Sequence, residues 1–258
     1  NIWKHIVSDG NMRKFILISM ITLASVSLGA CRQNVTIKQD APGQKAFLTD
    51  GQIYDLHSGK IISSSELLAD LATAQHLIIG EKHDNAEHHQ IELWLIQNLL
   101  IQRPQGSVLL EMLTSEQQPR VNQVKCWLKD NPVVRDSRVQ ELLNWQKGWS
   151  WEMYGDIVMQ LLRGPYPLLN ANIGREQILA LYKKNEFPKG KKSTAPVVQE
   201  ALRETIISMH EGNLESQQLT SMLSIQQQRD RYMARQLLSA PVPVSYTHLR
   251  AHETGRNL

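Results

Sequence analysis

The sequence predicts an α/β fold, in which a mainly parallel central sheet is flanked by helices and the C-terminal half is rich in helix. Three short apolar segments indicate this class, at residues 76–80, 107–112 and 167–173, because each is followed by a helical pattern. None of the three alternates clearly between apolar and polar residues, as expected of parallel strands covered on both faces. A hydrophobic fraction of 41% and a charged fraction of 21% fit a globular domain with a sizeable core.

The N-terminal region predicts a lipoprotein signal peptide over residues 12–30. Arg13 and Lys14 form a positive segment before the apolar run 15–28, which is too short to span a bilayer comfortably. The run ends in Leu-Gly-Ala-Cys, which resembles a bacterial lipobox and predicts that Cys31 is lipidated. The alternative is an ordinary secretory signal followed by an unrelated cysteine.

Residues 1–11 are interpreted on this basis as spurious upstream translation, and residues 31–46 as the lipidated cysteine and its tether. Arg32 stands where an aspartate would signal retention in the inner membrane. We therefore expect a chain anchored to the outer membrane by its lipid and facing the periplasm.

The following elements are predicted from turn and capping residues. The pairs Asp50-Gly51 and Ser58-Gly59 indicate a small hairpin within residues 47–60. A capping box from Ser63 to Glu66 begins a helix that runs to Ala74. Further helices are expected over residues 85–102, 115–129, 152–163, 174–185, 196–211 and 216–239.

The C-terminal residues 244–258 show neither helical nor strand periodicity. They resemble an adaptor-derived tail of the kind appended to unrelated protein sequences from sequencing assemblies. We therefore expect the α/β domain to cover residues 47–243 and to lack its last strand.

Polar side chains gather where the first of the three predicted strands ends. Glu81 and His83 follow Gly80 directly, and a helix carrying His88 and His89 begins after them. Glu111 lies at the end of the next predicted strand, and ligands bind at such strand ends in open α/β sheets. Imidazoles and carboxylates suit a divalent metal ion or a pair of general acid and base. The alternative is that the glutamates cap helices and the histidines satisfy polar edges.

Tyr154 is a second candidate, because a phenolate oxygen can bind ferric haem iron. Trp151 is one of three tryptophans within seven residues and could pack against a macrocycle. Arg175, at a predicted helix start, could pair with a haem propionate. A core tyrosine and a structural ion pair are the respective alternatives.

The sequence indicates neither a nucleic-acid partner nor a disulfide framework. The net charge is only +3 and no basic stripe is interleaved with aromatic residues, so we expect no nucleic-acid partner. The two cysteines, Cys31 and Cys126, do not form a disulfide framework, and we expect Cys126 to be a small buried hydrophobic residue.

Five sequence blocks in one order resemble the ChaN family of iron-regulated haem-binding lipoproteins, which is related to the Tiki/TraB and erythromycin-esterase superfamily. The resemblance covers about residues 47–238. The blocks are GEKHDNAEHH at 80–89, LEMLTSEQQ at 110–118, GWSWEMYGDIV at 148–158, NANIGR at 170–175 and RDRYMA at 229–234. The family usually has a Gly-x-Gly-His strand end after the last block, where this chain has PVPVSYTH, and Glu92 stands where glutamine is more common.

The resemblance implies a periplasm-facing lipoprotein that binds haem for an outer-membrane haem or iron uptake machinery. It also implies a homodimer that holds two haems face to face, with tyrosine as iron ligand, for which Tyr154 is the family-like choice. In enzyme branches of the superfamily, the positions of Glu81, His83, His89 and Glu111 are associated with hydrolysis, with or without a metal ion.

We therefore expect a haem carrier or store, with a hydrolase as the alternative. The solvent exposure of Tyr154 and of the histidine–glutamate cluster distinguishes a haem carrier from a hydrolase. A haem protein of this kind needs Tyr154 open to solvent, whereas a hydrolase needs the histidine–glutamate cluster open and Tyr154 buried.

Overall fold

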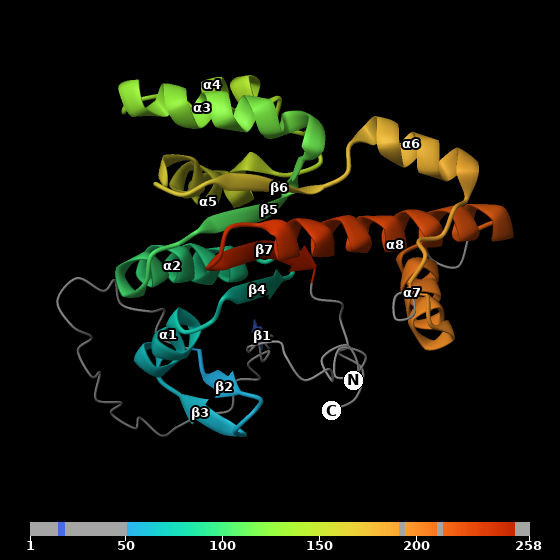
Figure 1. Cartoon of the computed structure of the whole chain (residues 1–258), viewed down its shortest axis with the longest axis horizontal. Helices are drawn as coiled ribbons and strands as arrows, with labels where there is room; N and C mark the ends of the chain where they lie inside the picture. The colour runs from blue at the N-terminus through green and yellow to red at the C-terminus, as the bar shows by residue number, and fades with distance from the viewer. Residues whose placement is uncertain (1–14, 19–50, 191–193, 211–213, 251–258) are drawn as a thin grey trace, which may run out of the picture.

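A parallel sheet of five strands forms the centre of the chain, as shown by a computed structural model that describes residues 15–18, 51–190, 194–210 and 214–250 (Figure 1). The strand order is β1-β4-β7-β5-β6, and every neighbouring pair is parallel. The strands are β1 Phe15–Ile18, β4 His76–Glu81, β5 Ser107–Thr114, β6 Leu168–Asn172 and β7 Val244–Arg250. The predicted α/β class with a mainly parallel sheet is confirmed.

The expectation that the last strand is missing is wrong. Residues 244–250 form β7 in the middle of the sheet, where it pairs with β4 on one side and β5 on the other. The first four residues of β7 are buried. A strand held by backbone hydrogen bonds on both sides and covered on both faces needs no alternation, so periodicity did not reveal it. The adaptor-derived origin of residues 244–258 stays a prediction.

β1 falls within the segment that we expect to be the signal peptide. Its four residues pair with β4, from Phe15 opposite His76 to Ile18 opposite Ile79. The other residues of the predicted signal peptide, the lipobox with Cys31 and most of the tether lie outside the described residues. Among the described residues, no helix is both long and apolar enough to cross a membrane.

Helices cover both faces of the sheet. They are α1 Ser64–Ala72, α2 Ala86–Gln102, the 3-10 turn η2 Ser115–Gln117, α3 Gln118–Asp130, α4 Asp136–Leu143, α5 Trp151–Arg163, α6 Arg175–Lys184, α7 Pro196–Met209 and α8 Ser216–Ser239. On β5, Val108 and Leu110 face a core formed with α2, α3, α4 and α5, whereas Leu109 faces α8. This double burial explains why β5 is apolar without alternation.

The helix starts predicted from capping residues are confirmed in their main features. Ser63 accepts a hydrogen bond from the Glu66 amide, and the Glu66 carboxylate accepts one from the Ser63 amide, which completes the capping box of α1. The predicted hairpin consists of β2 Ile53–Asp55 and β3 Lys60–Ile62. The expectation for Cys126 is wrong: it is exposed, because the buried face of α3 is formed by Val121, Val124 and Leu128.

A helical lobe formed by α6, α7 and the first half of α8 extends beyond the sheet (Figure 1). Within it, α6 and α7 both pack against α8. No residue of α6 is buried. The side chains of α6 are therefore exposed to some degree and do not belong to the buried core.

Lys125 closes the C-terminal end of α5. Its ammonium donates hydrogen bonds to the carbonyl oxygens of Leu161, Leu162 and Gly164 at 3.0, 3.0 and 2.9 Å. We expect Lys125→Met to lower the free energy of unfolding by about 2 kcal/mol, because it leaves these carbonyls without that donor. Urea denaturation measures the change, and Lys129→Met, one turn later on the exposed side of α3, is the matched control. Equal stability of the two variants would contradict this role.

Candidate functional site

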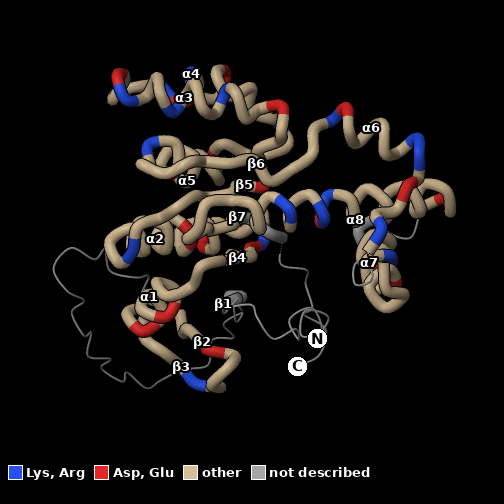
Figure 2. Tube along the Cα trace, in the orientation of Figure 1, with Lys and Arg blue, Asp and Glu red and all other residues tan. Residues whose placement is uncertain are grey.

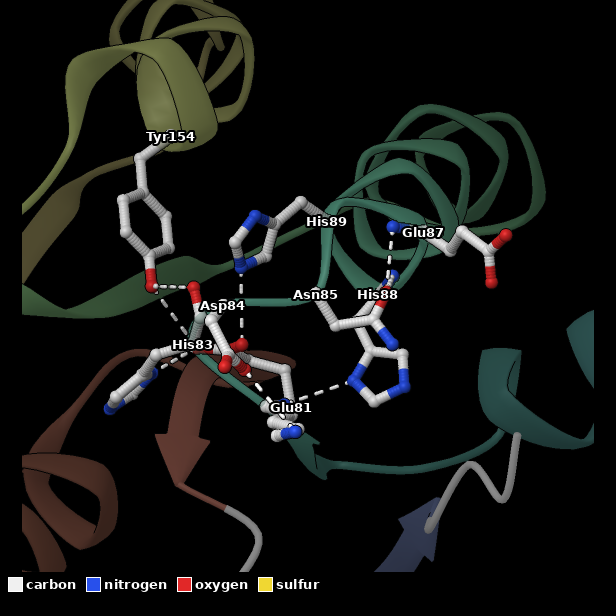
Figure 3. A network of polar contacts seen from close by, with 9 residues as sticks. Glu81, His83, Asp84, Asn85, Glu87, His88, His89 and Tyr154 are labelled. Atoms are coloured by element: carbon white, nitrogen blue, oxygen red, sulfur yellow. Dashed lines mark hydrogen bonds and ion pairs between the residues drawn. The ribbon is translucent and has the colours of Figure 1, made fainter. Parts of the chain in front are cut away.

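The predicted cluster forms at the C-terminal end of β4. Glu81 is the last residue of β4, and its side chain is 1% exposed. Asn85 caps α2 by accepting hydrogen bonds from the amides of Glu87 and His88. The short turn between the strand and the helix therefore brings the histidines of α2 back over Glu81 (Figure 3).

The Glu81 carboxylate holds two imidazoles, one on each oxygen. Oε1 pairs with His83 Nδ1, and Oε2 lies 3.1 Å from His89 Nε2. An ionised carboxylate only accepts hydrogen bonds, so both imidazoles donate to it. His83 then keeps Nε2 as an acceptor, and Figure 3 shows this nitrogen on the side of the ring away from Glu81. His89 is buried, whereas 29% of the His83 side chain is exposed.

Tyr154 of α5 completes the cluster and joins the two predicted sites into one. Its hydroxyl lies 3.2 Å from the carbonyl oxygen of His83 and 3.5 Å from Glu81 Oε1. Its ring lies 4.5 Å from the His89 ring and 5.6 Å from the Trp149 ring, centroid to centroid. Trp149 also meets the His83 ring edge to face at 5.0 Å. The cluster therefore has a buried half and a rim formed by His83 and Trp149.

The environment of Tyr154 keeps its phenol protonated. Burial raises its pKa well above the ordinary value, and the negative charges of Glu81, Glu92 and Glu111 raise it further. The side chain is 2% exposed. The solvent access that we required of Tyr154 as a haem ligand is thus not met in this structure.

His88 is separate from this cluster, although it adjoins it in sequence. Its Nδ1 accepts a hydrogen bond from the Lys82 amide at 2.9 Å. Burial lowers its pKa, so it is neutral at pH 7 and fixes the turn after β4. Figure 3 shows its ring on the side of Glu81 away from Tyr154.

The three other predicted residues are Glu111, Trp151 and Arg175. Glu111 contributes its charge to the surroundings of Tyr154, and its carbonyl oxygen accepts a hydrogen bond from Asn172. The Trp151 indole donates a hydrogen bond to Asp136 of α4 at 3.0 Å, which ties α5 to α4. Arg175 is exposed at the first position of α6, in the helical lobe.

Two residues of the site were not in the predicted set. Trp149 packs against His83 and Tyr154, as the tryptophan-rich segment 145–151 could have suggested. Glu92 is fully buried and its charge also acts on Tyr154. It lies three residues after His89 on α2, a spacing that places both on one face of the helix.

The predicted metal site is not supported. Among the residues that the structure describes, no three His, Cys, Asp or Glu side chains are grouped so that they could hold a metal ion. The Glu81 carboxylate instead forms hydrogen bonds with both His83 and His89.

Comparison with known proteins agrees with this fold. Residues 67–255 match the family described as haem-binding uptake, Tiki superfamily, ChaN. The chain belongs to this family. Its fold also matches a solved structure described as cofacial heme binding to ChaN of Campylobacter jejuni, with a TM-score of 0.70 and 29% identity. That match covers 76% of this chain and 78% of the other. In sequence comparison, no curated protein matches the chain.

Proposed function

We propose that this ChaN-family chain binds haem and carries or stores it for uptake, as a lipoprotein of the outer membrane that faces the periplasm. Family membership supports haem binding. The lipobox at Leu28–Cys31 supports the anchor. Haem supplies a ferric iron that a phenolate oxygen can bind, as in other tyrosine-ligated haem proteins.

The iron ligand is best assigned by comparing the six tyrosines. Tyr154, Tyr166 and Tyr246 are buried, and Tyr232 donates a hydrogen bond to Asn170 at 2.5 Å. Only two of the six are exposed residues, Tyr54 at 55% and Tyr182 at 44%. Tyr54 lies on the small hairpin, whereas Tyr182 lies on α6. Of these two, we choose Tyr182, because the neighbouring side chains on α6 suit a haem. We therefore assign the ligand to Tyr182 in place of Tyr154, and the exposure of Tyr182 is the observation that carries the proposal.

The surroundings of Tyr182 fit a haem. Arg175, Leu179, Tyr182 and Lys183 follow the spacing i, i+4, i+7 and i+8, which places them on one face of α6. Leu179 is 50% exposed and offers an apolar contact for the porphyrin ring. Arg175 and Lys183 provide cations for the propionates, and Figure 2 shows positive charge at both ends of α6. From Arg175 to Tyr182 the helix rises about 10 Å. Arg175 thus keeps its predicted role, whereas Trp151 lies on α5, outside this face.

A second copy of the chain would complete this site. The exposed face of one helix covers only one side of a flat macrocycle, so the other side would meet water. Two copies that bring their α6 faces together would bury both haems. The exposed side chains of Leu179 and Tyr182 support the homodimer that we expect, because exposed apolar side chains that lie together commonly mark an interface.

Titration of the full chain with ferric haem tests this function. We expect a shifted Soret band that saturates at one haem per chain, together with dimerisation in sedimentation experiments. A spectrum identical to that of free haem, given by protein shown to be folded by circular dichroism, would contradict the proposal.

Hydrolysis is a second candidate function, and the orientation of the His83 ring favours it. The buried Glu81 carboxylate orients the ring, and the outer Nε2 can accept a proton from water. The hydroxide formed in this way would add to the carbonyl carbon of an ester or amide. The acyl bond would then break, and the alcohol or amine would leave with the proton that His83 had accepted. Tyr154 is buried, as we required for this alternative. The open cluster that we also required is found only at His83, because Glu81 and His89 are buried.

Its test is the hydrolysis of a chromogenic ester by the haem-free protein. We expect a rate that His83→Gln lowers by at least about hundredfold, because the general base is lost. His57→Gln, on the exposed hairpin turn, is the control for nonspecific imidazole catalysis. Equal rates for the two variants would rule out His83 as the base.

A further inference from the structure

The β2–β3 hairpin has one face that packs on the core and one face that does not. Ile53 and Ile62 form a cross-strand pair that packs against Leu67, Leu68 and other residues of the core beneath α1. Tyr54 and Ile61 form the next pair, whose side chains point to the opposite face because strand residues alternate. With Leu56 they form what we call the hairpin face, with exposures of 55%, 60% and 65%.

We propose that the hairpin face rests on the lipid surface to which the chain is anchored. The inference depends on the proposed lipid anchor at Cys31. Twenty-one residues, 32–52, lie between that cysteine and the first residue of the hairpin, Ile53. A chain of this length can span at most roughly 70 Å. Among the described residues, the hairpin is the first element after the proposed anchor, and it lies within reach of the bilayer.

The chemistry of the face suits the interface between lipid headgroups and acyl chains. A tyrosine beside aliphatic side chains offers an apolar ring to the acyl-chain boundary and a polar hydroxyl to the headgroup layer, as in interfacial aromatic belts. Lys60 can keep its ammonium in the headgroup layer while its methylenes lie on apolar surface.

The charges near the face favour zwitterionic lipid. Asp55 is occupied within the hairpin turn, where its carboxylate accepts hydrogen bonds from the amides of His57 and Ser58. Lys60 offsets its charge, and Figure 2 shows one acidic and one basic position on the hairpin. Glu66 and Asp70 of α1 are exposed nearby and would weaken attraction to an anionic surface.

A protein partner fits the face less well. Stable interfaces bury roughly 800 Å² on each partner, and three half-exposed side chains on a short hairpin provide much less apolar area. A lipid surface needs no such area here, because the anchor supplies the attachment and the hairpin has only to orient the domain.

Depth-dependent quenching tests the proposal on the full lipidated chain in phosphatidylcholine–phosphatidylethanolamine vesicles. In a Cys126→Ser background, an environment-sensitive fluorophore is attached at Leu56→Cys. Val133→Cys is the matched control, because Val133 is an apolar residue 93% exposed in the segment between α3 and α4, on the opposite side of the sheet in Figure 1. We expect nitroxide lipids to quench the label at position 56 at least fivefold more than the label at 133. Adding Tyr54→Ser and Ile61→Ser should remove most of that difference.

Three other outcomes overturn the proposal. Equal quenching at both positions, from protein that floats with the vesicles, means that the hairpin does not touch lipid. A label at position 56 that is shielded from water before vesicles are added means that protein covers the face. Protein that does not float lacks the anchor and removes the basis of the proposal. Haem binding, read separately from the Soret band, is unaffected by any of these results.

Discussion

Tyr182→Phe is expected to lower the affinity for ferric haem by roughly hundredfold, which corresponds to about 2.7 kcal/mol. The substitution removes the only heteroatom of the side chain and leaves its ring and the fold of α6 in place. A titration followed at the Soret band measures the change. The spectrum of whatever complex forms should also lose the features of phenolate ligation.

Tyr154→Phe is the matched control for this prediction. It removes a hydroxyl in the same way, but from a buried side chain whose raised pKa keeps it protonated. We expect its haem affinity to stay within about twofold of the original chain. If Tyr154→Phe abolished binding and Tyr182→Phe did not, the cluster at β4 would have to open to admit haem, and our assignment of the ligand would be wrong.

Glu81→Leu is expected to lower the free energy of unfolding by about 3 kcal/mol, because it leaves buried donors without their acceptor. The carboxylate is the shared acceptor for His83 and His89, and the Tyr154 hydroxyl lies at its edge. Glu81→Gln should cost less, since an amide oxygen can still accept from one imidazole. Urea denaturation monitored by tryptophan fluorescence measures both variants.

The control for Glu81 is Glu87→Gln, which alters an exposed glutamate in the first turn of α2. Its effect should stay within about 0.5 kcal/mol. Because we place haem on α6, Glu81→Gln should retain haem binding while folded. A folded Glu81→Gln protein that no longer binds haem would show that the two sites are one.

The strands of the sheet were predictable where their burial gives a run of apolar residues in the sequence. β4, β5 and β6 contain short apolar runs that are bounded by Gly, Pro or polar residues, and each strand is followed by a helix. β7 was missed because its sequence, VSYTHLR, mixes polar and apolar residues. Its place is fixed by neighbours on both sides, and that information lies more than a hundred residues away in the chain.

The candidate site was predictable in part for a similar reason. Glu81, His83 and His89 lie within nine residues, so a strand followed by a helix was enough to bring them together. The contact of Tyr154 with Glu81 spans 73 residues and depends on how α5 packs on α2. Sequence could place Tyr154 on an apolar helix face but could not distinguish a buried phenol from an open one. Tyr182 lies outside the sequence blocks that resemble the family, and its exposure depends on how the lobe projects from the sheet, which the sequence does not show.

Resonance Raman spectroscopy of the ferric haem complex tests the central claim most directly, because it detects the vibrations of a phenolate bound to iron. We expect these vibrations in the complexes of the original chain and of Tyr154→Phe, and their loss in Tyr182→Phe. Phenolate vibrations that persist in Tyr182→Phe, or that are missing from the original chain, would contradict haem ligation on α6.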